Sequence, residues 1–516
     1  MKFSLFLLSA VAACASAASL GEQVSPENQP LYNSFTSSEF PYSPVDIEFR
    51  FQSDKDAYFK SLNVYNQLIR PHEFPSHALP LAIVKPTKGN NTNIAAVVKV
   101  AEALGLRVSA RSGGYMSGYS ANMAAVDKAS QDFLLVDLSK LQGIKISADK
   151  KIAEAEPGVT GALLAAETSK YGLMFAGPHT SRVTIGGFLL QGGMGVGSRL
   201  HGAGVDNVIG FDIVTATGKV LYVDRKRNKE LFFAVRGGGQ FFGIVTKFYL
   251  RLVPIAAKPS VEPAYNASTI PIDQVFTIFD RPQAMDLMNY YAKFDYSAPK
   301  ALENKIIFVV DAATGNKQYL FASQSAAPFN TSTAVTQAHA GMTEWYKTLP
   351  TVFASSEPNT YSGVVHGGDD SWPDNDDLAY YAEDVWFKAP LDPRVTETLV
   401  KQWDKVPSSM SSMALNTGTW DAPTKSALGF DRSYSLCIYS TWLRKGDAEE
   451  DQKNKKWLEE TIAAIKPYTL GFYANELRPR QLGEKKYWER CYEKKTYKTL
   501  KCTKEKWDPE NMFKSL

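Results

Sequence analysis

The spacing of apolar positions between residues 81 and 114 changes twice, which predicts three secondary-structure elements. Residues 81–86 form a short apolar run typical of a buried strand, and residues 107–114 form a second run that ends in a glycine turn. Residues 91–104 follow helical spacing instead, with four apolar side chains on one face: Ile94, Val97, Val98 and Ala101. A strand, a helix and a strand within about thirty residues indicate an α/β unit.

Alternation of strands and helices continues to about residue 254. Residues 132–141 predict another strand, and a helix is expected from about residue 160 to 171. Residues 208–223 predict two strands joined at Thr217–Gly218, which is a hairpin signal. Residues 230–254 predict a helix start, a glycine turn and a long strand.

Residues 264–470 have few glycine clusters and predict an antiparallel sheet with two amphipathic helices near residues 396–403 and 453–464. Strands are expected at 308–313, 380–389 and 433–444. Because side chains alternate along a strand, Tyr434 and Trp442 fall on one face and Tyr439 on the other. One of these faces, but not all three aromatic residues, can line a pocket. Tyr380, Tyr381 and Trp386 are further candidates to line the pocket.

The N-terminus has the order of a secretory signal peptide. Lys2 precedes an apolar run, and residues 15–17 are small, so residues 1–17 are predicted to be cleaved and residues 18–45 to be an irregular lead-in. The alternative is a buried N-terminal helix. No later stretch reaches the roughly 18 apolar residues of a membrane span, so we expect a secreted protein without a membrane segment. Sequons agree with secretion and predict N-glycans at Asn90, Asn266 and Asn330.

The cysteines after the predicted signal peptide and the net charge do not indicate a reaction type. Cys437 lies in a predicted strand and is expected to be a buried thiol. Cys491 and Cys502 are expected to pair in an oxidising compartment, with two unpaired thiols as the alternative. The net charge of +3 gives no sign of a nucleic-acid surface.

Three glycine clusters, at residues 111–120, 184–204 and 236–246, are the strongest chemical signal. Glycine permits positive φ and lets backbone N–H groups approach an anion, so several such turns can line the path of a pyrophosphate. The alternative for any one cluster is a tight loop. The spacing fits neither a dinucleotide-binding Rossmann motif nor a Walker A motif, and neither a zinc-ligand spacing nor a Gly-x-Ser-x-Gly elbow is present, so no metal site is expected.

At this point the residues resemble a family. Residues 77–120, 184–224 and 230–250 resemble the PCMH-type FAD-binding domain of the vanillyl-alcohol-oxidase group, and 471–475 and 504–513 resemble the tail of berberine-bridge-type members. This resemblance implies an α+β fold with a two-part FAD-binding domain and an α/β substrate domain with an antiparallel sheet. The implied boundaries are 46–256 for the FAD domain, 257–470 for the substrate domain and 471–516 for a segment returning to the FAD domain.

The resemblance also implies the residues that hold FAD. The first glycine turn would surround the pyrophosphate with backbone amides: Arg111, Ser112, Gly113, Gly114, Tyr115, Met116 and Ser117. The second cluster would pass beside the flavin: Ile185, Gly186, Gly187, Gly192 and Gly193. Three residues would lie near the adenine or pyrophosphate end: Asn207, Val208 and Ile244.

Two positions depart from the family pattern. Family members commonly attach FAD through a histidine at the position of Tyr115, and bicovalent members add a cysteine at the position of Thr180. Neither residue can form the usual bond, so FAD is expected to be held non-covalently. His179 lies next to Thr180, but its offset does not match an attachment residue.

The implied reaction is oxidation of a small organic substrate by hydride transfer to the flavin, with oxygen as the electron acceptor. The substrate would be a secondary metabolite, an alcohol or a carbohydrate. Tyr473 falls on the resembled Tyr-x-Asn strand and is the first candidate for the base, and Asn475 could orient substrate or flavin. A structural role for Tyr473 is the alternative. A non-redox cyclase or isomerase, or a binding protein without flavin, are competing hypotheses for the chain.

Overall fold

The computed structural model describes residues 24–36, 46–51, 55–62, 79–87, 91–115, 132–255, 271–325, 333–357, 359–366, 378–418, 425–428, 433–444, 446–474, 487–513 and 516. The predicted signal peptide lies outside these residues, as do the three sequon asparagines. Three candidate site residues also lie outside them: Met116, Ser117 and Asn475.

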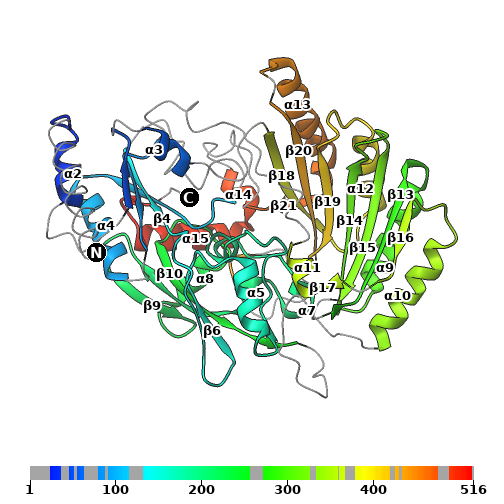
Figure 1. Ribbon diagram of the computed structural model, residues 1–516, viewed down its shortest axis with the longest axis horizontal. Helices are drawn as coiled ribbons and strands as arrows, with labels where there is room; N and C mark the ends of the chain where they lie inside the picture. The colour runs from blue at the N-terminus through cyan, green and yellow to red at the C-terminus, as the bar shows by residue number, and fades with distance from the viewer. Residues whose placement is uncertain are drawn as a thin grey trace, which may run out of the picture.

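The first sheet of the N-terminal part joins strands from the predicted α/β unit (Figure 1). Its order is β1 (Asp46–Phe49), β2 (Ala82–Lys85), β4 (Phe133–Asp137), β3 (Arg107–Arg111). Strand β4 runs parallel to both β2 and β3, whereas β1 is antiparallel to β2. The predicted helix is α4 (Asn91–Ala103), which buries Ile94, Val97, Val98 and Ala101. The helical spacing therefore located both the helix and its apolar face.

The second sheet of the N-terminal part is antiparallel and has the order β5-β6-β10-β8-β9. Its strands are β5 (Ile144–Ile146), β6 (Ile152–Ala155), β8 (Val208–Val214), β9 (Val220–Asp224) and β10 (Ile244–Arg251). The hairpin predicted at Thr217–Gly218 joins β8 and β9, and Gly218 has φ +67°. The chain segments that connect the strands of the second sheet contain the helices α5 (Gly161–Ser169), α6 (Ile185–Leu190), α7 (Ser198–His201) and α8 (Lys229–Val235). Helix α3 (Lys55–Leu62) packs on the first sheet instead.

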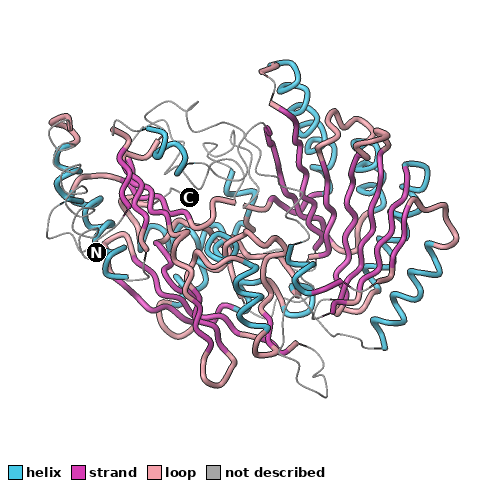
Figure 2. Tube along the Cα trace, in the orientation of Figure 1, coloured by secondary structure: helices cyan, strands magenta, loops and turns pink. Residues whose placement is uncertain are grey.

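An eight-stranded antiparallel sheet, called the large sheet below, forms most of the C-terminal half (Figure 2). Its strands follow in this spatial order: β16 (Phe353–Ser355), β13 (Gln274–Asp280), β15 (Lys317–Ser325), β14 (Leu302–Val310), β19 (Ser412–Thr417), β20 (Ser433–Leu443), β18 (Leu378–Lys388) and β21 (Thr469–Phe472). The predicted antiparallel sheet is therefore present. Two short ladders complete the strands: β7 (Leu173–Met174) with β11 (Val253–Pro254), and β12 (Pro271–Ile272) with β17 (Asn359–Thr360).

Helices cover one face of the large sheet and leave the other face toward the N-terminal part (Figure 1). The covering helices are α9 (Ala284–Ser297), α10 (Thr333–Tyr346), α12 (Pro393–Trp403) and α13 (Ala448–Ile465), and α11 (Tyr361–His366) lies between the two parts. The apolar core under the helices includes Tyr291, Phe308, Phe321 and Tyr434. Because successive side chains of a strand point to opposite faces, the residues that alternate with these core residues lie on the face toward the N-terminal part.

The C-terminal segment returns to the N-terminal part through α14 (Tyr487–Cys491) and α15 (Lys494–Trp507). Lys504 pairs with Asp508 and donates to the Phe241 carbonyl at 2.8 Å. The Asp508 carboxylate accepts from the N–H groups of Met512 at 2.7 Å and Phe513 at 2.9 Å. The Met512 carbonyl then accepts from the Val108 N–H at 2.8 Å, so the chain end lies along the open edge of β3.

The structure corrects two expectations. The lead-in is not wholly irregular, because α2 (Gln29–Thr36) lies within it. Tyr32 and Phe35 of this helix pack on Phe49 with ring centroids 5.6 and 6.4 Å apart. Cys491 and Cys502 form no disulfide: Cys491 is buried, whereas α15 presents Cys502 to solvent.

Candidate functional site

A cavity lies between the N-terminal part and the uncovered face of the large sheet. Three segments of the N-terminal part contribute to its lining: the end of β3 with the turn to Tyr115, the segment from Pro178 into α6, and the start of β10. The remaining wall comes from β14, β15, β18, β19 and β20 and from Tyr473 directly after β21. Two predicted regions, the glycine turns and the sheet, therefore meet at one site.

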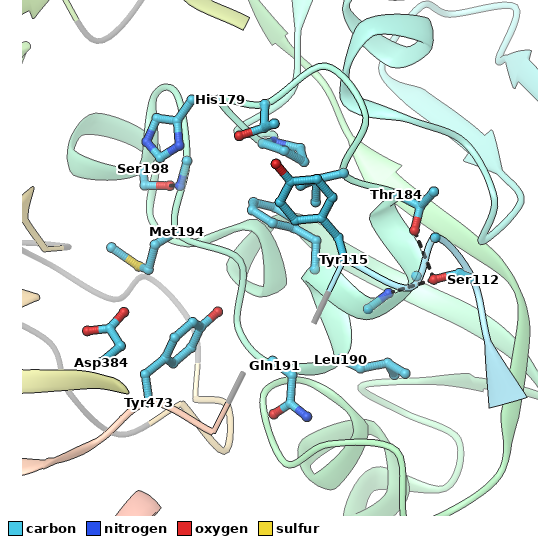
Figure 3. A pocket seen from close by; sticks show the side chains of 18 of the residues that line it. Ser112, Tyr115, His179, Thr184, Leu190, Gln191, Met194, Ser198, Asp384 and Tyr473 are labelled. Atoms are coloured by element: carbon cyan, nitrogen blue, oxygen red, sulfur yellow. Dashed lines mark hydrogen bonds between the residues drawn. The ribbon is translucent and has the colours of Figure 1, made fainter. Parts of the chain in front are cut away.

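A hydrogen-bonded contact joins the turn after β3 to the first turn of α6 (Figure 3). Ser112 Oγ accepts from Thr184 Oγ1 at 2.9 Å and from the Gly187 N–H at 3.1 Å. The segments approach so closely that a Cβ on Gly113 would lie 2.7 Å from Thr184 Oγ1. A Cβ on Gly186 would lie 2.7 Å from Ser112 Oγ and 2.9 Å from the Pro157 carbonyl. Glycine is therefore required at these positions by the packing of the two segments.

The turn after β3 also presents backbone donors to the cavity. In the described part of the chain, the N–H groups of Gly113 and Gly114 have no hydrogen-bond acceptor, and both residues line the cavity. Gly114 has φ +67°, a conformation that favours glycine. Successive backbone N–H groups that converge in such a turn form a binding site for an anion.

The Arg111 side chain stabilises this turn, and its positive charge does not point into the cavity. Its guanidinium pairs with Asp137 at 2.5 Å and donates to the Ser61 carbonyl at 2.6 Å. Both partners of the ion pair are buried. The pair links the ends of β3 and β4. Because the guanidinium is engaged in these contacts, the cofactor contact predicted at Arg111 would come from its backbone and not from its side chain.

Ten of the predicted site residues line the cavity: Arg111, Ser112, Gly113, Gly114, Tyr115, Thr180, Gly186, Gly187, Ile244 and Tyr473. Five do not line it: Ile185, Gly192, Gly193, Asn207 and Val208. The Asn207 amide donates to the His201 and Ala203 carbonyls and accepts from Arg251. Ile185 and Val208 belong to the apolar core. Gly193 still takes part indirectly, because its N–H donates to the Tyr473 hydroxyl at 3.4 Å.

The large sheet contributes a polar wall with aromatic side chains. The lining side chains are Glu303 and Lys305 of β14, Gln324 of β15, Asn416 of β19, Ser435, Cys437 and Tyr439 of β20, and Tyr380, Asp384 and Trp386 of β18. Tyr381, Tyr434 and Trp442 belong to the core on the helix-covered face. The prediction that Tyr439 lies opposite to Tyr434 and Trp442 is therefore confirmed.

Asp384 and Tyr473 lie beside each other in Figure 3, across the cavity from Ser112 and Thr184. The Asp384 carbonyl accepts from the Tyr473 N–H at 2.9 Å. The Cys437 thiol donates to Asp384 Oδ2 at 3.2 Å, so Cys437 is a half-buried cavity residue and not the core thiol that the sequence predicts. Burial raises the pKa of the Asp384 carboxyl to about 7, against the opposing effect of the Cys437 hydrogen bond.

A second group of charges lies at the β14 part of the wall. Burial raises the pKa of Glu303 to about 7, although the Arg199 N–H donates to its carboxylate at 3.3 Å. Burial lowers the pKa of Lys305, and the negative charge of Glu303 opposes that shift. Burial and the charge of Lys305 lower the pKa of His179 to about 4, so His179 is neutral near pH 7. These groups can bind a polar part of a ligand.

Sequence reasoning missed Asp384 and Gln191. Gln191 follows α6, is 3% exposed and lines the cavity, and its Oε1 has no donor among the described residues. Asp384 follows Glu383 in an otherwise largely apolar strand, and two carboxylates in such a strand are the signal that could have found it.

Comparisons with known proteins agree with this geometry. Residues 80–224 match the family model described as an FAD binding domain. The FAD-linked oxidoreductase ptmO of Penicillium ochrochloron is 25% identical over 477 residues, which cover 90% of this chain and 95% of that protein. The berberine bridge enzyme-like protein 24 of Arabidopsis thaliana is 31% identical over 268 residues, which cover 50% of this chain and 46% of that protein. The chain therefore contains an FAD binding domain and is similar to FAD-linked oxidoreductases and to berberine bridge enzyme-like proteins.

The fold of this FAD-linked oxidoreductase is also that of solved relatives. The berberine bridge enzyme-like protein 1 of Physcomitrella patens superposes with a TM-score of 0.73 at 17% identity and covers 95% of this chain and 98% of that chain. The α+β fold with a PCMH-type FAD-binding domain is therefore confirmed.

The residues present fit FAD. The free N–H groups of Gly113 and Gly114 suit its phosphates, and the unpartnered Gln191 Oε1 suits an N–H donor of its ring system.

None of the helices in the described part of the chain has the length and apolar character of a membrane span. Within the same residues, no group of three or more His, Cys, Asp or Glu side chains could hold a metal ion.

Proposed function

We propose that this oxidoreductase oxidises a small organic substrate by hydride transfer to FAD, with oxygen as the final electron acceptor. One observation supports this most: the cavity is continuous from the glycine turn after β3 to the polar face of the large sheet. A cofactor held at the turn would therefore meet a substrate held on the sheet. FAD supplies the hydride acceptor, and the protein supplies orientation and proton transfer. The substrate is a secondary metabolite, an alcohol or a carbohydrate.

FAD is held without a covalent bond in this proposal. Tyr115 and Thr180 line the cavity at the positions where the sequence pattern expects attachment residues. Neither side chain carries the imidazole nitrogen or thiolate sulfur that forms such a bond. His179 also lines the cavity, and a bond to its imidazole is the competing arrangement.

Tyr473 and Asn475 are proposed to contact the reacting end of the substrate. The Tyr473 ring packs edge to face against Trp386, with centroids 5.7 Å apart and planes at 88°. The Gly193 N–H donates to its hydroxyl at 3.4 Å, which directs the phenol toward the second glycine cluster. These two contacts orient the phenol, so it can hold a hydroxyl or amine of the substrate in a single position.

The remaining proposals concern domains and processing. Residues 46–256 and 471–516 would form the FAD domain, and residues 257–470 the substrate domain. The signal peptide over residues 1–17 would be removed on secretion, with glycans at Asn90, Asn266 and Asn330. Mass determination of the secreted protein before and after enzymatic deglycosylation tests both points, because the cleaved N-terminus and each glycan change the mass separately.

The absorption spectrum of the purified protein tests the cofactor proposal directly. Flavin bands are expected in the native protein, and they should move wholly into the supernatant after acid precipitation. Yellow colour that stays in the precipitate would contradict non-covalent binding and direct attention to His179. A colourless protein that FAD does not reconstitute would contradict the oxidoreductase proposal.

A non-redox reaction, such as cyclisation or isomerisation, is the second candidate. Tyr115 and Thr180 favour this second candidate, because they stand where relatives have flavin-attachment residues. A protein that has lost these residues can have lost the redox reaction while keeping the fold. Anaerobic mixing with substrate separates the two candidates. Bleaching of the flavin absorbance supports oxidation, whereas product formation without bleaching and without oxygen uptake supports the non-redox reaction.

A further inference from the structure

Lys305 is a cation on β14 whose side chain lies on the cavity face of the large sheet. In the part of the chain that the structure describes, its ammonium has neither a hydrogen-bond acceptor nor an ion-pair partner. The buried Lys504 ammonium, by contrast, pairs with Asp508. A charge withdrawn from water normally has an opposite charge or several acceptors beside it. A ligand in the cavity can supply the acceptors that Lys305 lacks.

Glu303 lies two residues earlier on the same face of β14 but is not the missing partner. Its carboxylate accepts from the Arg199 N–H at 3.3 Å. The Gly197 N–H and the Gln324 side chain also form hydrogen bonds with it. Neutral donors of the protein therefore engage the carboxylate, and the charge of Lys305 remains available to the cavity.

His179 contributes a second donor from the N-terminal part of the cavity wall. Burial, together with the positive charge of Lys305, lowers the pKa of His179 to about 4, so its imidazole is neutral near pH 7. This electrostatic effect requires the two side chains to lie near each other. A neutral imidazole has one N–H donor, and among the described residues that donor has no acceptor. A charged donor and a neutral donor thus face the cavity from its two walls.

We propose that Lys305 and His179 bind a carboxylate of the substrate, and this inference rests on the proposed function. The single cation favours a group with a single negative charge. A doubly charged group such as a phosphate would leave its second charge without a cation and close to Glu303. The substrate class is therefore a small organic acid that also carries the alcohol or other group to be oxidised.

The sheet register places this carboxylate far from the carbon that is oxidised. Cross-strand pairs lead from β14 to β18: Lys305–Asn416, Asn416–Ser435 and Ser435–Trp386. Three strand spacings therefore separate Lys305 from Trp386, which is roughly 14 Å along the sheet. Tyr473, proposed to contact the reacting end, packs on Trp386, and His179 lies apart from it (Figure 3). The lysine side chain spans part of this distance, and the substrate must span the rest with several bonds.

The charged groups around the site predict weaker carboxylate binding as the pH rises. Burial raises the pKa of Glu303 to about 7, so a negative charge develops near the bound anion above that pH. Burial also lowers the pKa of Lys305, so its positive charge is lost at a lower pH than in an ordinary lysine. Arg199 of α7 is committed to Asp295, and β15 and β19 contribute neutral amides. Binding should be strongest at about pH 5–6, where an acid with a pKa near 4 is already ionised.

The experiment compares acids with their carboxamides by calorimetric titration of the flavin-loaded protein at about pH 6. The probes are phenylacetate, phenylbutyrate and phenylhexanoate, each with its carboxamide. We expect at least one acid to bind about 30-fold or more tightly than its amide, and Lys305→Met to remove that difference by weakening the acid alone. Lys305→Gln keeps a donor without the charge and should lose the difference as well. Lys305→Arg should keep most of it, because a guanidinium also donates to carboxylates.

Two further variants separate a local charge effect from a general one. Lys388→Met removes the same charge from the exposed end of β18, outside the cavity lining, and should keep the preference for the acid. Glu303→Gln should abolish the loss of affinity near pH 7, because no negative charge then develops beside the anion.

The outcomes distinguish this inference from the proposed function. Equal binding of acid and amide in all three pairs, with flavin bound, overturns the carboxylate site and leaves the proposed function in place. An unchanged preference in both Lys305→Met and Lys305→Gln also overturns it, because another group then holds the anion. A wild-type protein that binds no flavin contradicts the proposed function instead, and the substrate assignment fails with it.

Discussion

At the residue scale, the burial of Asp384 has a cost for the folded protein. The pKa of its carboxyl is about 7 in the fold against 3.8 in an ordinary aspartate. Between these values the folded protein binds more protons than the unfolded chain, so its free energy of unfolding falls as the pH rises. Asp384→Asn should remove this dependence and gain roughly 2–4 kcal/mol of stability at about pH 8, with no gain near pH 4. Denaturant titration at both pH values measures the difference.

Gly186 provides a second test at this scale. A Cβ there would lie within 3 Å of Ser112 Oγ and the Pro157 carbonyl, as the 2.7 and 2.9 Å distances show. Gly186→Ala should therefore separate the turn after β3 from α6 and weaken FAD binding by at least about tenfold. Flavin fluorescence during dialysis measures the loss. Gly341→Ala is the control, because a Cβ there meets nothing within 4 Å; a similar loss in both variants would contradict the packing argument.

At the element scale, the chain's pattern predicts some parts of the molecule well and others poorly. Helix α4 and the hairpin of β8 and β9 were predictable, because local spacing and turn residues determine them. The order of the large sheet was not, because pairing such as β14 with β19 joins residues more than a hundred positions apart. Strand β18 is buried on both faces, so alternation gives no sign that Asp384 faces the cavity. Cys437 was assigned to the core for the same reason.

A buried ion pair connects two elements on either side of the cavity wall. Arg199 of α7 donates to Asp295 of α9 at 2.6 Å, and both side chains are 2% exposed or less. Thr417 and Asn304 also donate to this carboxylate. Arg199→Met should lower the free energy of unfolding by about 3–5 kcal/mol, because it leaves a buried charge without its cation.

The matched control for this pair is Arg281→Met. Arg281 also pairs with an aspartate, Asp404, at 2.6 Å, but both side chains are more than a third exposed. Its loss should cost about 1 kcal/mol or less. Urea unfolding of the two variants compares them, and equal losses would show that burial is not the deciding factor.

At the scale of the whole molecule, the C-terminal segment closes the first sheet. The Asp508 carboxylate pairs with Lys504 and accepts the Met512 and Phe513 N–H groups. Asp508→Ala should leave the Lys504 ammonium buried without its anion and release the chain end from β3, with a loss of about 3–5 kcal/mol. Limited proteolysis should then remove the C-terminus early.

Lys506→Ala serves as the comparison within the same helix. Lys506 pairs with Glu230 on the surface, and its side chain is 61% exposed, so its loss should be hardly measurable. Early cleavage of Lys506→Ala as well would mean that α15 is held by its exposed charges rather than by Asp508.

The Met512 carbonyl that bonds to Val108 has a consequence for synthesis of the chain. The outer edge of β3 and the turn that follows it are made early, but their partner, Met512, is made only after the large sheet. Until then the edge is open to other strands, a state in which newly made chains are prone to aggregate. Stable cofactor loading should therefore wait until Met512 has been made, and nascent chains stalled before residue 508 should need a chaperone to remain unaggregated.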